Sequence, residues 1–516
     1  MAVSQTVTEF VTQSPVGRRG FKRILAGSLG FSLVGALLGA AALSDRPELG
    51  AAVGAGGMFL AVSTLVALVD WRVGLGLLVV IVLSEDSLRK ALPGAPGWVS
   101  LGKDFVVVAC YLSFLFAPAL AHYRRELSNR VFLLFIAPIA LWALFVVLQA
   151  FNPGVPHWLV GVSGIRTWFL YVPMAFLIAS IMRDEASVLR LFRWVAVVSI
   201  PLLAVALAQN WFGSQLPSFL REGVFKRERS LAGGGWIGYN ESLFASPTLY
   251  SLVCVFLLCV TTGLLRAGHF TRRWTILLWI AGYSAVAGAY ISGVRTGVLF
   301  VLCAIAAISP MLLWRVYRAP DGNHYRRRGL VAGGIAGLLI GALLLSAMGE
   351  LRMRALVTSF DPGIVEDRLE KAIDEARYSH GGDFGHGTGT AGASGRVMSL
   401  LGEPSPSNEW VEWGTAVITY SFGDAGVYLG VFVGLWLFLG MLSFAAERRM
   451  GRLFPLRYAL WVYLCAQMSW YLFKAFPVLE NGTMSLIFWS SAGAIIGINR
   501  LEGGSAAPNT PNLRLP

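Results

Sequence analysis

The sequence predicts an all-α fold, a polytopic bundle of transmembrane helices, and two observations carry this prediction. Of the 516 residues, 56% are hydrophobic and only 14% are charged, and the mean hydropathy is +0.64. Apolar runs of about 17–25 residues also recur along almost the whole chain, and each can span a bilayer as a helix. We therefore expect one integral membrane domain over residues 1–516, with a large hydrophilic loop at residues 349–414.

The apolar runs predict about 12–14 spans. The segment Asp70-Trp71-Arg72 separates two of them, which form either two helices or one kinked helix. In chain order the runs lie near residues 24–44, 51–69, 73–84, 104–121, 131–150, 166–182, 194–212, 244–265, 274–291, 296–314, 329–348, 425–445, 458–476 and 484–499.

The net charge of +13 would suggest a nucleic-acid partner in a soluble protein, but a membrane protein offers a simpler explanation. Cytoplasmic loops collect Lys and Arg, and most of these residues fall inside when the N-terminus is placed in the cytoplasm. We therefore expect cytoplasmic N- and C-termini, membrane lipid as a partner and no nucleic acid. The five cysteines all lie in apolar runs, where they act as small apolar fillers and not as disulfides or metal ligands.

Three short outer elements carry arginine against this charge rule. Arg166 stands at the start of the sixth run, and Arg295 follows Ser292-Gly293, a predicted tight turn. The loop at 212–243 holds a basic cluster before a glycine run: Arg221, Lys226, Arg227 and Arg229. Each element alone can be a snorkelling arginine or a solvated loop. Together on one face they favour an anion site, because the planar guanidinium donates paired hydrogen bonds to a phosphate.

The large loop ends with two carboxylates, Glu409 and Glu412, as the chain returns to the membrane. Their i, i+3 spacing puts them on one face of a helix, beside tryptophans that favour a raised pKa and a general-base role. An interfacial or capping acidic pair is the structural alternative. Earlier in the loop, residues 381–390 are too glycine-rich for regular structure and form a lid, a substrate-facing loop or a flexible tether. No Asp-x-Asp or His cluster accompanies these residues, so no metal site is expected.

Four sequence pieces follow one another along the chain: Gly164-Ile-Arg-Thr-Trp-Phe, Ser292-Gly-Val-Arg-Thr-Gly, the glycine stretch Gly385-His-Gly-Thr-Gly389, and Glu412 followed by Asp424-Ala-Gly-Val-Tyr-Leu-Gly430. Their order, and the side of the membrane on which they are predicted to lie, are more specific than any single motif. Over roughly residues 130–445 the chain thereby resembles the O-antigen ligase and O-antigen polymerase (Wzy-like) superfamily of bacterial membrane glycosyltransferases.

The resemblance implies a GT-C-like fold in the bacterial cytoplasmic (inner) membrane, with an extracytoplasmic active face. It implies transfer of a glycan from an undecaprenyl diphosphate donor to an acceptor hydroxyl, without metal or cofactor. Arg295 and Arg166 would hold the diphosphate with Arg229 and Arg227, and Glu412 or Glu409 would be the base. Ligases of the family usually place a histidine near that base; its absence here favours the polymerase branch or another polysaccharide subgroup. A flippase or chain-length regulator would be the protein partner.

Two other functions stay open. A polyprenyl-monophosphate glycosyltransferase would use Glu85 and Asp86, an acidic pair at an outer helix mouth, as base and metal site. An anion or solute transporter would line its pathway with Arg295 and Arg166. Transporters tend to have internal repeats and charges near the midplane, and this sequence has no clear repeat.

Overall fold

The structure is a computed structural model of the protein. It describes residues 47–91, 98–116, 129–217, 246–268, 270–318, 382–391, 414–446, 451–473 and 481–504, with shorter pieces at 30, 32–34, 36–38, 220, 229–230, 236–237, 242–244, 366, 370, 373–374 and 377.

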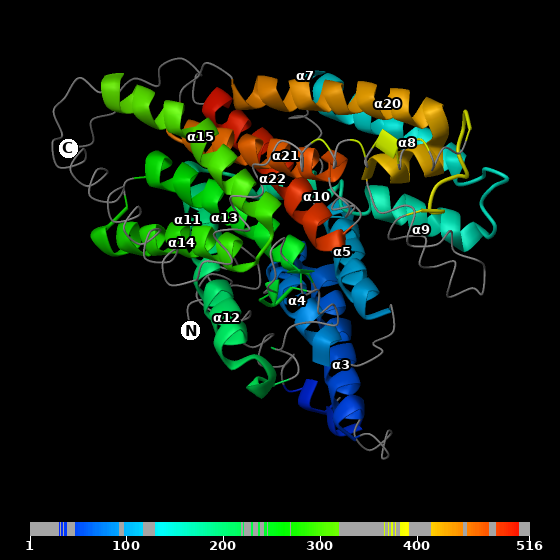
Figure 1. Ribbon diagram of the computed structural model, residues 1–516, viewed down its shortest axis with the longest axis horizontal. Helices are drawn as coiled ribbons and strands as arrows, with labels where there is room; N and C mark the ends of the chain where they lie inside the picture. The colour runs from blue at the N-terminus through cyan, green and yellow to red at the C-terminus, as the bar shows by residue number, and fades with distance from the viewer. Residues whose placement is uncertain are drawn as a thin grey trace.

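Within these residues the secondary structure is helical apart from one pair of two-residue strands, β1 (Arg229–Ser230) and β2 (Trp236–Ile237). Figure 1 shows the helices in chain order. They are α3 (Pro47–Val69), α4 (Trp71–Ala91), α5 (Trp98–Phe116), α7 (Asn129–Val131), a π-helical turn (Phe132–Ile136), α8 (Ala137–Gln149), α9 (Trp158–Phe169), α10 (Met174–Ile181), α11 (Glu185–Val197), α12 (Ser199–Phe212), α13 (Pro247–Ala267), α14 (Arg272–Ile291), α15 (Arg295–Arg318), α20 (Gly414–Ala445), α21 (Phe454–Phe473) and α22 (Gly482–Gly504).

Seven helical stretches in the described part of the chain are long and apolar enough to cross a membrane. These helices confirm the prediction of an all-helical membrane protein. The predicted count of about 12–14 spans and the GT-C-like arrangement stay predictions. The seven are Phe132–Gln149, Trp158–Ile181, Glu185–Phe212, Pro247–Ala267, Arg272–Ile291, Ala416–Ala445 and Gly482–Glu502.

Several helix ends differ from the predicted runs. The sixth run begins at Trp158 instead of residue 166 and breaks between α9 and α10, so Arg166 lies in the last turn of α9 and not at a helix start. The break follows from Pro173, which has no N–H to donate to the carbonyl of Phe169; the Val172 N–H takes that carbonyl instead, in a tighter turn. Asp70 separates α3 from α4 as two helices, and its carboxylate accepts the N–H of Arg72.

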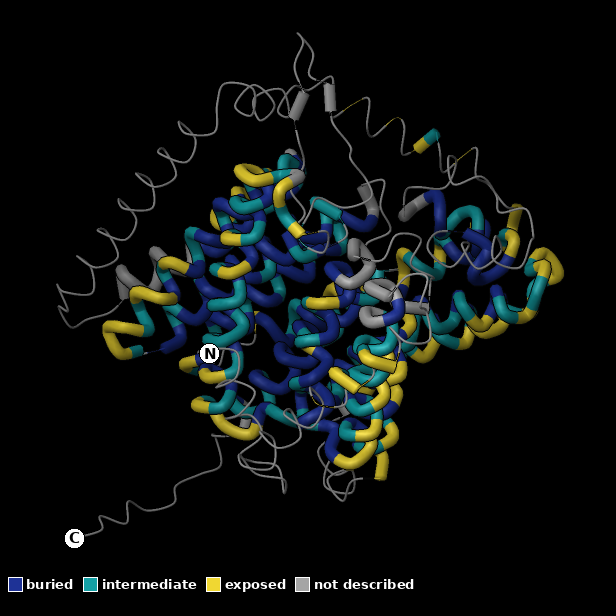
Figure 2. Tube along the Cα trace, turned by 90° about the horizontal axis from the view of Figure 1, so that it is seen from below, coloured by how far each residue is buried: buried dark blue, intermediate teal, exposed yellow. Residues whose placement is uncertain are grey.

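Apolar packing holds the helices in three clusters. The largest joins α10 to α15 with α20, α21 and α22, with α13 at its centre. A second unites α3, α4 and α5 with the chain around Tyr171 and Met174, and a small aromatic cluster lies between α8, α9 and α20. Figure 2 shows that the buried residues lie in the interior of the helical bundle and the exposed ones at its periphery. The break between α9 and α10 lies where the three clusters meet.

Arginines that the charge rule places on the cytoplasmic side bind helix ends at one end of the bundle. Arg500 donates to the carbonyls of Ala179 and Met182, and Arg452 donates to the carbonyl of Ala267. Arg457 is fully buried and pairs with Glu502 at 2.7 Å. These contacts bring the predicted inner segments together, which agrees with the predicted alternation of the spans. Which side of a membrane they face stays a prediction.

The N-cap of α11 supports a pH-dependent stability prediction. The Asp184 carboxylate accepts the Ser187 N–H at 2.7 Å and the Ser187 hydroxyl at 2.8 Å, and the backbone bond holds its pKa below 3.8. Asp184→Ala is expected to reduce the free energy of unfolding by about 1 kcal/mol at neutral pH. Because the folded pKa is depressed, this contribution is complete above the unfolded pKa and is lost as the pH falls through the folded one.

Denaturant unfolding of the detergent-solubilised protein at pH 7 and near pH 3 measures this difference. Glu366→Gln, a change at an exposed helical residue in the large loop, is the control. A stability difference of equal size at both pH values would contradict the capping account.

Candidate functional site

Arg166 is held by a carboxylate that the sequence analysis did not single out. Its Nε donates to Oδ2 of Asp104 at 2.6 Å, and one terminal nitrogen pairs with the same oxygen. The hydroxyl of Tyr171 donates to the other oxygen, Oδ1, at 2.5 Å. Asp104 lies near the start of α5, and Tyr171 lies in the break between α9 and α10. Arg166 is therefore fixed in direction and remains 34% exposed, which does not fit a freely snorkelling side chain.

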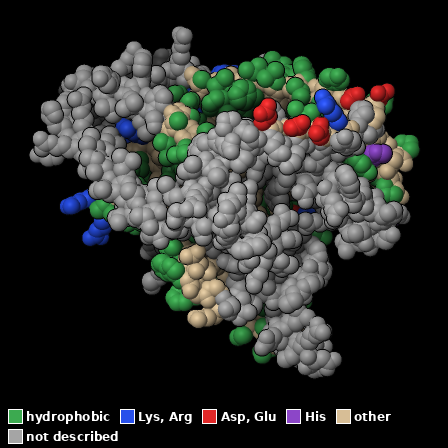
Figure 3. Space-filling model, in the orientation of Figure 1, with side chains coloured by type: hydrophobic (Ala, Val, Ile, Leu, Met, Phe, Trp, Pro, Cys, Tyr) green, Lys and Arg blue, Asp and Glu red, His purple; other side chains and the backbone are tan. Residues whose placement is uncertain are grey.

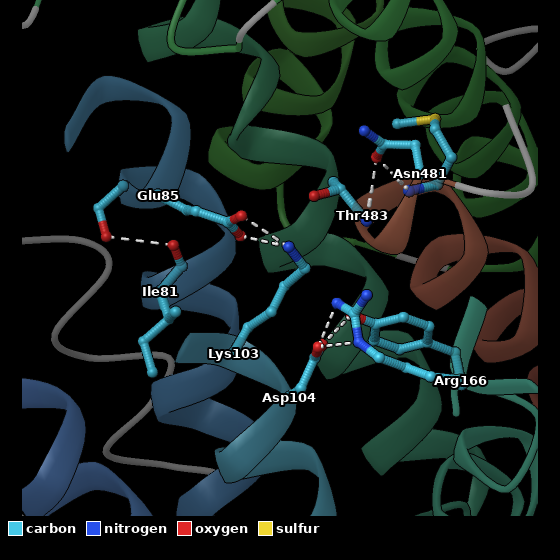
Figure 4. Close-up of polar contacts among 10 residues, drawn as sticks. Ile81, Glu85, Lys103, Asp104, Arg166, Asn481 and Thr483 are labelled. Carbon is cyan, nitrogen blue, oxygen red and sulfur yellow. Dashed lines mark hydrogen bonds and ion pairs between the residues drawn. The ribbon is translucent and has the colours of Figure 1, made fainter. Parts of the chain in front are cut away.

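A second ion pair lies beside the first. Lys103, the residue before Asp104, donates to both carboxylate oxygens of Glu85 at 2.6 Å. The side chains of Lys103 on α5 and Glu85 on α4 are only 6% and 5% exposed. Asp86, the next residue, is also buried. Figure 4 shows both ion pairs around the start of α5, beneath the first turn of α22.

The first turn of α22 covers this cluster. Asn481 caps it by accepting the N–H groups of Thr483 and Met484. The backbone of Gly482 packs closely on two side chains of the cluster. A Cβ at this position would lie 2.5 Å from the Tyr171 hydroxyl and 2.7 Å from Cε of Lys103. Only glycine lets this backbone approach both side chains.

The turn before Arg295 is present as predicted. α14 ends at Ile291, Gly293 has φ +76°, and α15 begins at Arg295. The Ser292 hydroxyl fixes the turn by donating to the carbonyl of Ala289 and accepting the N–H of Val294. The first turn of α15 packs tightly on α13, because a Cβ on Gly297 would collide with the Ser251 hydroxyl.

One helix contacts both arginine-bearing elements. On α21, the ring of Trp470 stacks on the ring of Phe300 with their centroids 5.1 Å apart. Phe300 lies on α15, five residues after Arg295. Tyr471, the neighbour of Trp470, meets Trp168, two residues after Arg166, at 6.3 Å. The elements that carry Arg166 and Arg295 therefore lie against consecutive residues of α21.

The basic loop at 212–243 is anchored to the same end of the bundle. Buried Gln209 at the end of α12 donates to the carbonyls of Leu220 and Ser242, and so ties the two ends of the loop. Ser87, two residues after Glu85, donates to the carbonyl of Leu243. Within the loop the backbone of Arg229 pairs with that of Ile237 in the short hairpin, whereas Arg227 lies outside the described residues.

Residues 387–391 of the glycine-rich piece are packed into the fold, so the prediction of a flexible tether is wrong for them, whereas the lid and the substrate-facing loop stay predictions. Thr388 donates its N–H to the carbonyl of Gln149, and His386 donates to that of Tyr420. Gly389 has φ +87° and fits against the Val160 carbonyl of α9, where any Cβ would collide. Residues 387–391 are buried. The prediction that the stretch has no regular structure is confirmed, because its φ angles alternate into the left-handed region.

This piece makes an exposed acidic surface near the N-terminal part of α20. Asp383 and Asp424 are exposed and are held near each other by the bonds from Asp424 N–H to the Gly382 carbonyl and from Ala425 N–H to the Asp383 carbonyl. Figure 3 shows acidic side chains gathered at this end of the molecule. Glu409 and Glu412 lie outside the described residues, and α20 begins at Gly414, two residues after Glu412.

No protein-family model matches this chain, and no curated protein matches its sequence. The site must therefore be interpreted from its residues alone. Sequence reasoning found Arg166 and Glu85 but missed Lys103, Asp104, Tyr171 and Gly482. The available signal was the adjacent Lys-Asp pair at the start of an apolar run, where two ionisable groups need partners.

Proposed function

We propose that the protein is a membrane glycosyltransferase of the O-antigen polymerase or ligase type. It transfers or polymerises a glycan from an undecaprenyl diphosphate donor onto an acceptor hydroxyl, at the outer face of the bacterial cytoplasmic membrane. The observation that carries this proposal is the oriented, partly exposed guanidinium of Arg166, in a charged cluster where three helix packing units meet. Ligand sites in helical bundles commonly lie between such units.

The arrangement suits a donor that carries its own activation. No nucleotide is available outside the cytoplasm, whereas a lipid diphosphate is a leaving group that arginine can stabilise as its charge develops. Arg166 and Arg295 belong to elements that share α21, and the basic loop is anchored beside Glu85. Glu412, or Glu409, would deprotonate the acceptor hydroxyl, and the lipid diphosphate would depart as an anion.

The alternative that assigns the base and a metal site to Glu85 and Asp86 is weakened by the surroundings of Glu85. Both oxygens of that carboxylate already accept hydrogen bonds from the Lys103 ammonium, which neutralises the charge a metal would need. The alternative expects activity that requires a divalent ion and is lost in Glu85→Gln, while Glu412→Gln is tolerated.

Purified protein incubated with undecaprenyl diphosphate-oligosaccharide in EDTA tests the proposal. Chain growth on a gel is the expected result. Growth that appears only after a divalent ion is added would favour the monophosphate enzyme, and solute flux in proteoliposomes without glycan transfer would favour a transporter.

Asp104 is expected to act as a positioning residue for Arg166. Asp104→Asn weakens the charge-assisted pair, so we expect KM for the lipid-linked donor to rise roughly 10-fold. Asp104→Glu keeps the charge and should restore most of the activity. The kinetics would be measured on folded protein checked by size exclusion. A loss of folded protein with unchanged KM in the remainder would show a purely structural role.

A further inference from the structure

We infer that Lys103 is a second phosphate-binding cation and that Glu85 is its built-in counter-anion, which a phosphate group of the ligand replaces. The ligand class is a polyprenyl diphosphate, so the inference deepens the proposed function and rests on it for that class. It concerns binding, however, and is tested without any transfer reaction.

The ion pair between Lys103 and Glu85 is buried in the bundle. Both side chains are almost excluded from solvent, and the two hydrogen bonds share one ammonium group. A buried ion pair adds little stability over an apolar pair of the same shape, because desolvation offsets the attraction. Ionisable side chains inside a membrane bundle therefore mark functional positions by default.

A comparison within the protein separates this pair from a structural one. The Arg457–Glu502 pair lies at the other, predicted inner end, and Glu502 also accepts the N–H of Leu453 just before α21. That pair fixes the start of a helix. The Lys103–Glu85 pair instead stands beside a cation that remains partly exposed, Arg166.

The geometry brings the two cations to one place. Lys103 and Asp104 are consecutive residues of α5, and each forms an ion pair with a different partner. Lys103 pairs with Glu85, and Asp104 pairs with Arg166. The approach of Gly482 to both Lys103 and Tyr171 shows that the lysine stem and the hydroxyl that holds Asp104 share a neighbour. Figure 4 shows the Lys103 ammonium and the Arg166 guanidinium on the same side of α5.

The charges explain why carboxylates are present in a site for an anion. Each of the two cations has a carboxylate partner, Lys103 with Glu85 and Arg166 with Asp104, so the buried Lys103 ammonium is not left unpaired in the empty site, which would be costly. A diphosphate brings the same oxygen acceptors with more negative charge. When it binds, the ammonium of Lys103 transfers its hydrogen bonds from Glu85 to a phosphate oxygen. The Glu85 carboxylate, left without its cation, takes up a proton from solvent, and no bond between heavy atoms changes.

This exchange predicts effects of opposite sign for the two partners. Lys103→Met removes a ligand contact and should weaken binding of farnesyl diphosphate by roughly 10-fold or more. Glu85→Gln removes the competitor and should tighten it several-fold. The double variant Glu85→Gln/Lys103→Met removes both charges of the pair, which favours a folded protein, and should bind as weakly as Lys103→Met.

The dissociation constant would be measured by calorimetry on the full-length protein in detergent with EDTA. Farnesyl diphosphate is the lipid probe, and inorganic pyrophosphate is the probe without a lipid chain. Comparing the two distinguishes a lipid headgroup from a free phosphate as the ligand. Unchanged affinity in the double variant, or weaker binding in a folded Glu85→Gln protein, overturns the inference. If the variants change the affinity for farnesyl diphosphate in the expected directions but the protein transfers no glycan, the inference about Lys103 stands and the proposed function is wrong. If the wild type transfers glycan but Lys103→Met leaves the affinity unchanged, the proposed function stands and the inference is wrong.

Discussion

Replacing Arg295 with alanine is expected to slow glycan transfer by about 10²–10³-fold, the usual cost of removing one preorganised donor to a developing negative charge. The backbone supports such a role. The turn fixed by Ser292 and Gly293 sets the start of α15, and Gly297 locks the first turn of that helix against α13. Arg295 is thus carried on a rigid element at the end of the bundle where Arg166 lies.

The control for this change is Arg272→Ala. Arg272 is exposed at the opposite end of the same helical hairpin, so its loss changes net charge equally but leaves the predicted outer end intact. Initial rates with a saturating lipid-linked donor would be compared for both variants. Equal rates in Arg295→Ala and Arg272→Ala would remove Arg295 from the mechanism.

Glu412→Gln is expected to lower the rate by about 10²–10⁴-fold, because glutamine has the same shape but cannot accept the proton of the acceptor hydroxyl. Donor affinity should change little, so the loss should appear in kcat.

Glu366→Gln is the matched control, since it makes the same chemical change at an exposed position of the same loop. Glu409→Gln is measured in parallel. A near-wild-type rate for Glu412→Gln with a large loss for Glu409→Gln would move the base to Glu409, and full activity in both would exclude this carboxylate pair.

Most of the helical framework could be predicted from hydrophobicity alone, because a span needs little more than length and apolar composition. The run at 274–291 appears as α14, and its turn to α15 could be read from Ser292-Gly293. The extension of the sixth run back to Trp158 could not, because Gly161, Ser163 and Gly164 are weak helix formers in a sequence. In the structure the two glycines lie inside α9, where Gly161 packs on Ala150 and Gly164 on the backbone of Gly389. The break at Pro173 has a local signal in the sequence, since a proline within an apolar run interrupts a helix.

The arginines of the site could be predicted, but their partners could not. An isolated arginine in an apolar region is visible in a sequence, whereas the pairing of Arg166 with Asp104, 62 residues away, depends on how α5 packs against the break between α9 and α10. The same holds for Gly389, whose fit against Val160 needs the loop and α9 to be placed together. In a sequence, a glycine in a loop indicates only backbone conformational freedom. The packing shows that Gly389 serves the close approach of two backbone segments.

The most direct test of diphosphate binding by Arg295 compares wild type and Arg295→Ala in chain growth on undecaprenyl diphosphate-oligosaccharide in EDTA. We expect metal-independent elongation by the wild type and a loss of about 10²–10³-fold in the variant, with Arg272→Ala unaffected. No elongation by folded wild-type protein with any cognate repeat unit, or full activity in Arg295→Ala, would contradict this expectation.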